Sequence, residues 1–172
     1  VELTDASLAN ADLSSVDLTG ARLTRVQLAG VNLSGAKLAG ATATDAQFEG
    51  AILTDANLAG ATLTGADLAN VKLVKANLAR VDLRSANLAS ADLSDANVDG
   101  ADFTGANLTH TILDGIDTSV AKGLDTNRTV GGKIGPHVLQ LETVSQKAAR
   151  LELHATIDLP DGQRMRLTIH TA

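Results

Sequence analysis

Carboxylate and carboxamide side chains are the groups of this sequence that could most readily do chemistry. An Asp or Asn stands directly before Leu at many places, as at Asn57, Asp67 and Asp92. Repeated carboxylates could supply a general acid–base pair or a ladder of calcium ligands. An acid–base pair, however, needs a concave, partly desolvated site that shifts its pKa values, and nothing in this pattern creates one. We therefore interpret these residues as solvated positions on an outer wall.

Other catalytic and metal-binding patterns are missing from the sequence. It has no Cys, which excludes disulfides, thiolate metal sites and Cys nucleophiles. It has no phosphate-binding glycine loop, HExxH motif or Ser-His-Asp spacing. Glu152, His154 and His170 could approach one another as zinc ligands, but the two histidines would be only diagonal neighbours on a sheet. We predict no metal site, no cofactor and no enzyme activity.

A five-residue repeat positions the polar residues from residue 1 to residue 118. Each unit has a small residue, a polar residue, Leu, a small or hydroxyl residue, and then Gly, Asp or Asn. Leu holds the central position in 19 of 24 units. A period of five fits neither a helix, with 3.6 residues per turn, nor a flat strand, with a period of 2, so the chain must turn every five residues. Short inward-facing segments separated by turns describe the walls of a β-solenoid.

The exposed positions indicate how many walls make one coil. Residues one coil apart stack about 4.8 Å from each other, and a coil of twenty residues gives sensible columns. One column holds glycines, as a turn with positive φ would select: Gly20, Gly40, Gly60 and Gly100. Two further columns would place a cation between two carboxylates: Asp5, Arg25 and Asp45, and Asp55, Lys75 and Asp95. By the same spacing Lys72 lies beside Asp92.

The motif A-[DN]-L-x-x, as in Ala56-Asn57-Leu58 and Ala106-Asn107-Leu108, resembles the pentapeptide-repeat family over about 118 of the 172 residues. The resemblance implies an all-β, right-handed, four-sided β-helix of about six coils, which would be about 28 Å long. The central residues would point inward. We expect the core to include these six: Leu53, Leu58, Leu63, Leu68, Phe48 and Phe103. Phe48 adjoins Ala43, so its ring offsets the missing Leu.

Charge is unevenly distributed along the chain. Residues 1–118 carry 7 basic and 15 acidic side chains, a net charge of −8, whereas residues 119–172 carry 7 and 5, a net charge of +2. Arg80 interrupts the glycine column and Arg84 interrupts a column of threonines. Neither has an acidic neighbour in its column, and both project near one corner. We therefore choose Arg80 and Arg84 as candidate contacts for a partner.

The repeat gives way to a different pattern in the last third of the chain. We predict a solenoid over 1–120, a linker over 121–136 that begins with a register slip at Ala121-Lys122-Gly123-Leu124, and a C-terminal unit over 137–172. That unit contains three strand-like runs, 137–144, 150–159 and 163–171, and Pro160-Asp161-Gly162 marks a hairpin. The alternation pairs Ile157 with Met165. The apolar face needs a cover, so we expect the sheet to cap the solenoid, with dimerisation through the same face of a second chain as the lesser possibility. Any self-association of the solenoid is expected at its N-terminal coil.

These features favour a non-enzymatic, rigid scaffold or protein–protein interaction module with an unidentified protein partner. The alternative comes from the resemblance: some family members bind DNA gyrase as acidic duplex mimics and give quinolone or toxin resistance. The absence of an inserted loop and the interspersed cations weaken that alternative. We expect no direct binding of nucleic acid and no membrane association. No signal peptide or membrane-spanning run is visible, which favours a bacterial cytoplasmic location, and the missing initiator Met indicates a processed chain or a fragment.

Overall fold

The computed structural model describes residues 1–124, 140–147, 150–158 and 164–170, with side chains for the first of these ranges. The chain divides into two compact units, Val1–Lys133 and Ile134–Ala172. The elements in chain order are the 3-10 helix η1 (Thr118–Val120) and the strands β1 (Gln140–Lys147), β2 (Arg150–Asp158) and β3 (Arg164–His170).

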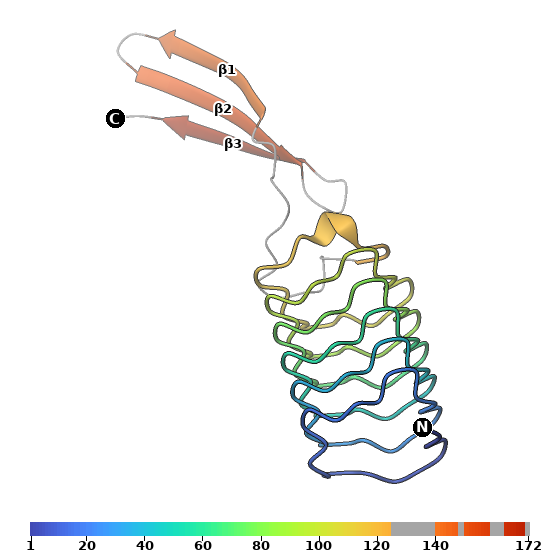
Figure 1. Ribbon diagram of the computed structural model, residues 1–172. Coiled ribbons are helices and arrows are strands. Elements are labelled where there is room, and N and C mark those ends of the chain that lie inside the picture. Colours follow the sequence, from blue (N-terminus) through green and yellow to red (C-terminus); the bar gives the residue numbers. More distant parts are fainter. Residues whose placement is uncertain (125–139, 148–149, 159–163, 171–172) are drawn as a thin grey trace. The chain divides into compact units, whose positions relative to one another are not determined.

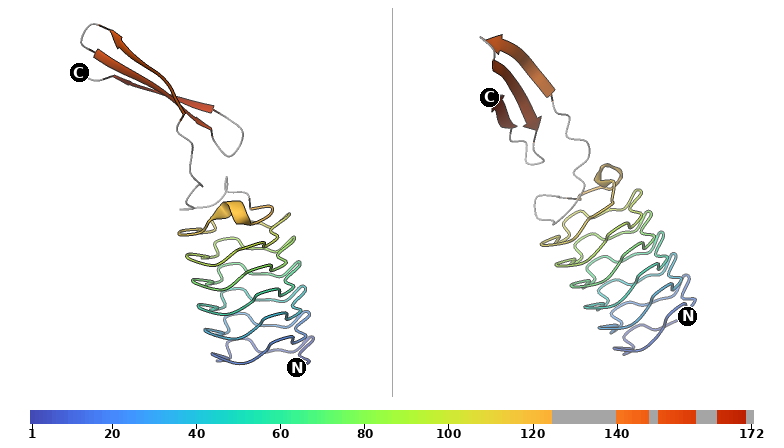
Figure 2. Two further views of the ribbon diagram at one scale, coloured as in Figure 1. Left: turned by 45° about the horizontal axis from the view of Figure 1, so that its top comes forward. Right: turned by 90° about the vertical axis from the view of Figure 1, so that its left-hand side faces the viewer.

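Residues 1–115 form a stack of coils with four sides each (Figure 1). In every five-residue unit the second residue forms a parallel bridge, and the fourth and fifth residues form a turn. Each bridge joins residues that are twenty apart, such as Thr62 with Asp82. Four units therefore complete one coil, and the turns of successive coils lie above one another (Figure 2). The predicted four-sided β-helix is confirmed.

Backbone hydrogen bonds tie each coil to both of its neighbours. At a central position, the Leu63 N–H donates to the Asp82 carbonyl of the next coil at 2.7 Å. At the position before, the Thr62 N–H donates to the Ala41 carbonyl of the preceding coil at 2.9 Å. The Ala66 N–H closes the turn on the Leu63 carbonyl at 3.0 Å. This pattern repeats along the stack, so most N–H groups of the unit have backbone partners.

The interior is filled by the central residues and the small residues two positions before them. The six residues expected in the core are at most 2% exposed: Leu53, Leu58, Leu63, Leu68, Phe48 and Phe103. Ala43 is also 2% exposed, on the wall that adjoins Phe48 in the same coil. A ring and a methyl group thus occupy space that two leucines fill in other coils.

The fifth position of each unit takes the left-handed backbone conformation. In the predicted glycine column, φ lies between +64° and +66° at Gly20, Gly40, Gly60 and Gly100. Arg80 occupies the same column with a φ of +55°. An L-residue there is strained relative to Gly. The chain therefore presents the Arg80 side chain outward from a turn at a conformational cost.

The stack ends differently from the sequence prediction. Thr118 does not occupy an inward central position, because η1 begins there with the Asp117 side chain accepting from the Ser119 N–H at 2.9 Å. The register then returns. Lys122 pairs with Asp102, twenty residues before it, and its carbonyl accepts from the Phe103 N–H at 2.7 Å. The departure from the repeat thus starts at Thr118, earlier than the predicted slip.

The C-terminal unit contains an antiparallel sheet of order β1-β2-β3, and the register of its first pair shifts between Leu141 and Thr143. Strands β2 and β3 pair Ile157 with Met165, the pair named from the sequence. The linker from residue 125 onward and the Pro160-Asp161-Gly162 turn lie outside the described residues. The capping contact between the sheet and the solenoid stays a prediction.

Candidate interaction surface

Asp and Asn at the second position of each unit have a structural task that the sequence interpretation missed. The N–H of the fourth residue takes no part in the backbone pattern. The side chain two residues before accepts from it; Asp12 Oδ1, for example, accepts from the Ser14 N–H at 3.0 Å. All thirteen such residues between 12 and 117 make this bond: Asp12, Asp17, Asn32, Asn57, Asp67, Asn77, Asp82, Asn87, Asp92, Asn97, Asp102, Asn107 and Asp117. The local preference of Asx side chains for the N–H two residues on was the available signal.

These hydrogen bonds make the outer carboxylates poor candidates for acid–base chemistry. The Ser14 N–H lowers the pKa of Asp12, and the Thr19 side chain, followed by its N–H, lowers the pKa of Asp17. A general acid needs a raised pKa, whereas donors to the charged form shift it the other way. In the range 1–124 every resolved shift of a carboxylate lowers its pKa, through turn donors in most cases and through Arg25 at Asp5.

Polar contacts between coils have a direction. Asn87 donates from Nδ2 to Asp67 Oδ1 at 2.9 Å, and Asn107 donates to Asn87 in the same way at 3.0 Å. The donor thus belongs to the later coil. Ion pairs between coils follow the same rule, with the carboxylate twenty residues before the cation: Glu2–Arg22 at 2.9 Å, Asp5–Arg25 at 2.7 Å, Asp17–Lys37 at 3.8 Å and Asp102–Lys122 at 3.1 Å.

The side chains at the turns explain this direction. The Asp45 carboxylate extends over the following coil, where its Oδ1 lies 2.5 Å from the place a Cβ on Gly65 would take. Asp95 extends over Gly115 in the same manner. Each carboxylate therefore lies away from the cation of the preceding coil. The predicted columns exist, but the ion pairs in them are not two-sided. Arg25 forms an ion pair with Asp5 and none with Asp45, although Asp5 and then Asp45 both raise the pKa of Arg25, and Lys75 forms no ion pair with either neighbour within 4.0 Å.

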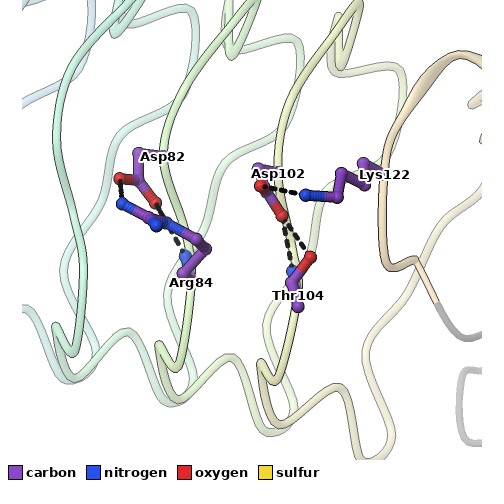
Figure 3. Close-up of polar contacts among 5 residues, drawn as sticks. All are labelled: Asp82, Arg84, Asp102, Thr104 and Lys122. Atoms are coloured by element: carbon purple, nitrogen blue, oxygen red, sulfur yellow. Dashed lines mark hydrogen bonds and ion pairs between the residues drawn. The ribbon is translucent and has the colours of Figure 1, made fainter.

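Arg84 differs from the sequence prediction because it has an acidic partner in its own unit. Its Nε and Nη2 donate to the two oxygens of Asp82 at 2.8 and 2.7 Å (Figure 3). The second and fourth residues of an extended unit face the same way, so they meet directly. The Arg84 guanidinium lowers the pKa of Asp82 to about 2. Arg80 lies on the turn before, so the two arginines occupy successive turns and not one corner.

The cations without ion pairs gather in one coil. Of the eight Lys and Arg residues in 1–124, five form ion pairs within 4.0 Å. The other three are Lys72, Lys75 and Arg80, all exposed and all within the coil formed by residues 61–80. We call these three residues the basic belt. It includes Arg80, one of the two predicted contact residues, whereas Arg84, the other, forms an ion pair with Asp82.

The described part of the chain contains neither a metal-binding cluster nor a membrane-spanning helix. No group of three or more His, Cys, Asp or Glu residues is placed to hold a metal ion there. Among the same residues, no helix has the length and apolar character needed to cross a membrane.

Comparison with known proteins concerns the repeat. Residues between 2 and 117 match pentapeptide repeats in eight copies. Among solved structures, HetL, a pentapeptide repeat protein involved in heterocyst differentiation regulation from the cyanobacterium Nostoc sp. strain PCC 7120, is 29% identical; the alignment covers 64% of this chain and 67% of HetL, with a TM-score of 0.38. Rfr23 from the cyanobacterium Cyanothece 51142 is 26% identical over 70% of this chain and 59% of its own, with a TM-score of 0.41. QnrB1, a plasmid-mediated fluoroquinolone resistance protein, is 21% identical over 70% and 69%, with a TM-score of 0.48. No curated protein sequence matches the chain.

Proposed function

The chain belongs to the pentapeptide-repeat family, and we propose that it is a non-enzymatic, rigid scaffold that binds a protein partner through the outer faces of its coils. The observation that carries this proposal is the two-way backbone ladder. Each middle coil donates hydrogen bonds to the coil before it and to the coil after it. Outer side chains are therefore held at fixed places on flat faces, as a pre-organised binding surface requires.

The outer polar groups also favour binding over catalysis. Carboxylates at the second positions accept turn N–H groups, and Asp82, the carboxylate of residues 1–124 with a strongly shifted pKa, is held by Arg84. Such contacts fix side chains without creating a group ready to donate or accept a proton at neutral pH. A surface of fixed polar groups and small residues suits recognition of another macromolecule.

Rigidity can be tested by amide hydrogen exchange. We expect the N–H groups of the central residues from Leu23 to Leu93 to exchange slowly and at similar rates, because all of them donate to the next coil. Protection confined to a few coils would contradict a rigid platform. Photo-crosslinking groups placed at outward positions of the folded protein would then identify the face that contacts a partner.

Binding to DNA gyrase as a duplex mimic is the alternative that needs its own test. A duplex mimic presents a continuous acidic surface, whereas the basic belt interrupts the acidic coils on both sides of it. We therefore expect no inhibition of gyrase supercoiling by a stoichiometric amount of the protein. Strong inhibition that disappears after Asp92→Asn and Asp95→Asn would favour the duplex mimic over the scaffold.

A further inference from the structure

Two of the three cations of the basic belt have no carboxylate at the position twenty residues before them. Four of the five cations that form ion pairs in residues 1–124 are paired by the residue twenty positions before them. Lys72 follows Ile52 and Arg80 follows Gly60, so neither has an acid at that place. Lys75 follows Asp55, yet the two form no ion pair within 4.0 Å. Asp92 lies beside Lys72 in the following coil, but no ion pair forms between them within 4.0 Å, so the three cations are open to the carboxylates of another molecule.

The face beside the belt is small and flat. Lys75 and Arg80 occupy the turns at the two ends of one side of the coil, and Lys72 lies on the adjoining side. Between the two turns the outer surface carries Asn77 and Ala79, both half-buried. Asn77 is already engaged, since its Oδ1 accepts from the Ala79 N–H at 3.1 Å and its Nδ2 donates to Asn57 at 3.2 Å. No large side chain prevents an extended chain from lying across this face.

The belt is one coil high, and both neighbouring coils are acidic. The coil of residues 41–60 contains Asp45, Glu49 and Asp55, and the coil of residues 81–100 contains Asp82, Asp92, Asp95 and Asp99. Successive coils are about 4.8 Å apart. A nucleic-acid duplex or an anionic bilayer is far wider, so its phosphates would meet these carboxylates as well as the cations. The height of the belt matches a single polypeptide strand.

A single-stranded nucleic acid is also a poor fit to this surface. Such chains bind through aromatic side chains on which bases stack, together with a basic groove. The two aromatic residues, Phe48 and Phe103, are buried in the core with exposures of 1% and 0%. Of the anionic ligands considered, the one that fits this surface is a single polypeptide strand that carries carboxylates.

We propose that the basic belt binds an extended acidic segment of a partner protein, whose carboxylates approach Lys72, Lys75 and Arg80. This inference rests on the proposed scaffold function and specifies the partner's chemistry. The partner supplies the acids that positions 52 and 60 do not. The contact is electrostatic and lies on an exposed surface, so binding weakens as ionic strength rises.

The test measures binding of a fluorescein-labelled peptide of alternating Glu and Ser to the full chain by fluorescence anisotropy at low salt. The belt variant is K72Q/K75Q/R80Q. Its matched control is R22Q/R25Q/K37Q, which removes three cations that already have acidic partners. Both variants change the net charge by the same amount. We expect Kd to rise about tenfold in the belt variant, from three exposed ion pairs, and less than about twofold in the control.

Equal weakening in both variants would show a general charge effect and would overturn the proposal, as would unchanged binding in the belt variant. Tighter binding of a poly-dT oligonucleotide or of phosphatidylglycerol vesicles through the same three cations would overturn the choice of an acidic polypeptide. Melting curves of both variants establish that they are folded, and the single variants K72Q and R80Q serve if a triple variant is not. Failure of the peptide to bind would overturn the acidic partner but would not affect uniform hydrogen-exchange protection, which tests the scaffold. The two proposals can therefore fail separately.

Discussion

Leu63 lies at the centre of a middle coil, and a charged group there cannot reach water. Its side chain is 2% exposed, and its N–H bonds to the next coil. We expect Leu63→Asp to destabilise the protein by several kcal/mol, because an unpaired carboxylate would be buried among leucines. The loss is comparable to the roughly 5–15 kcal/mol that stabilises a whole domain. Thermal or urea unfolding measures it.

Thr62→Asp is the matched control for that substitution. Thr62 points outward at a second position, where Asp in other units accepts the N–H two residues on. We expect this variant to fold and to melt within a few degrees of the wild-type protein, since surface changes cost about 0.5 kcal/mol or less. Near-native melting of Leu63→Asp would refute the inward assignment.

Asp82 and Arg84 make stability depend on pH in the acid range. The pKa of Asp82 falls from 3.8 to about 2 in the folded protein, because Arg84 donates to its carboxylate. As pH falls, the Asp82 carboxylate is therefore protonated first in the unfolded chain. The stabilisation from the Asp82–Arg84 pair is fully present above about pH 5 and is lost as pH falls through 4 toward 2. Arg84 is 55% exposed at its side chain, so solvent screening limits the contribution to about 1 kcal/mol.

Arg84→Gln tests this linkage. The difference in unfolding free energy between wild type and variant should be constant at neutral pH and shrink between pH 4 and pH 2. Arg80→Gln is the control, because it removes one positive charge that forms no ion pair within 4.0 Å and lies on a different turn from Arg84. A difference that grew on acidification would contradict the assignment of the shift to Arg84.

At the scale of an element, Gly123 holds the segment that returns to the stack after η1. Its φ is +70°, and a Cβ there would lie 2.6 Å from the Thr104 nitrogen and 2.7 Å from its Cα. The obstacle is backbone, so the segment itself must move. We expect Gly123→Ala to break the bond from the Phe103 N–H to the Lys122 carbonyl and to speed exchange of that amide at least tenfold.

Gly100→Ala separates the cost of the backbone conformation from the cost of the clash. Gly100 has a φ of +66°, but its nearest neighbour would be Arg80 Cγ at 3.5 Å, an ordinary contact. The free energy of unfolding of this control should fall by about 1–2 kcal/mol, and hydrogen exchange of the Phe103 amide should change little. Similar exchange at Phe103 in both variants would mean that the contact with Thr104 does not hold the returning segment.

The sequence predicts the structure correctly for features that depend on the five-residue or twenty-residue period. The inward place of Leu63 and the turn at Gly60 follow from the five-residue unit, and the stacking of Thr62 on Asp82 follows from the twenty-residue coil. A period is symmetric, however, so it predicts an ion pair of Arg25 with Asp5 and one with Asp45 equally well. The direction in which turn side chains extend decides between them. The Asp82–Arg84 ion pair could have been predicted, because the two residues lie on one face of the same unit. The columns of residues twenty apart do not contain this pair.

At the scale of the whole molecule, the residues of the first and last coils are buried to different extents. At the N-terminal end Val1 is 73% exposed, and Leu3, Leu8 and Leu13 are only partly buried. Self-association there stays a prediction. At the other end, Ala121 and Leu124 pack against the core, and Leu113 is fully buried. Residues 118–124 thus cover part of the last coil, so the predicted capping by the C-terminal sheet would be a second cover.

Two truncations decide which segment covers the last coil. Removing residues 125–172 leaves η1 and Leu124 in place, whereas removing residues 118–172 uncovers Leu108 and Leu113, which are 3% and 0% exposed. Each large apolar side chain returned to water costs about 1.5–3 kcal/mol, so we expect the longer deletion to cause a large loss of stability or aggregation and the shorter one a much smaller change. Differential scanning calorimetry and light scattering measure the two effects. If the shorter deletion alone caused the whole loss, the sheet would be the cap, and residues 118–124 would only connect it to the coils.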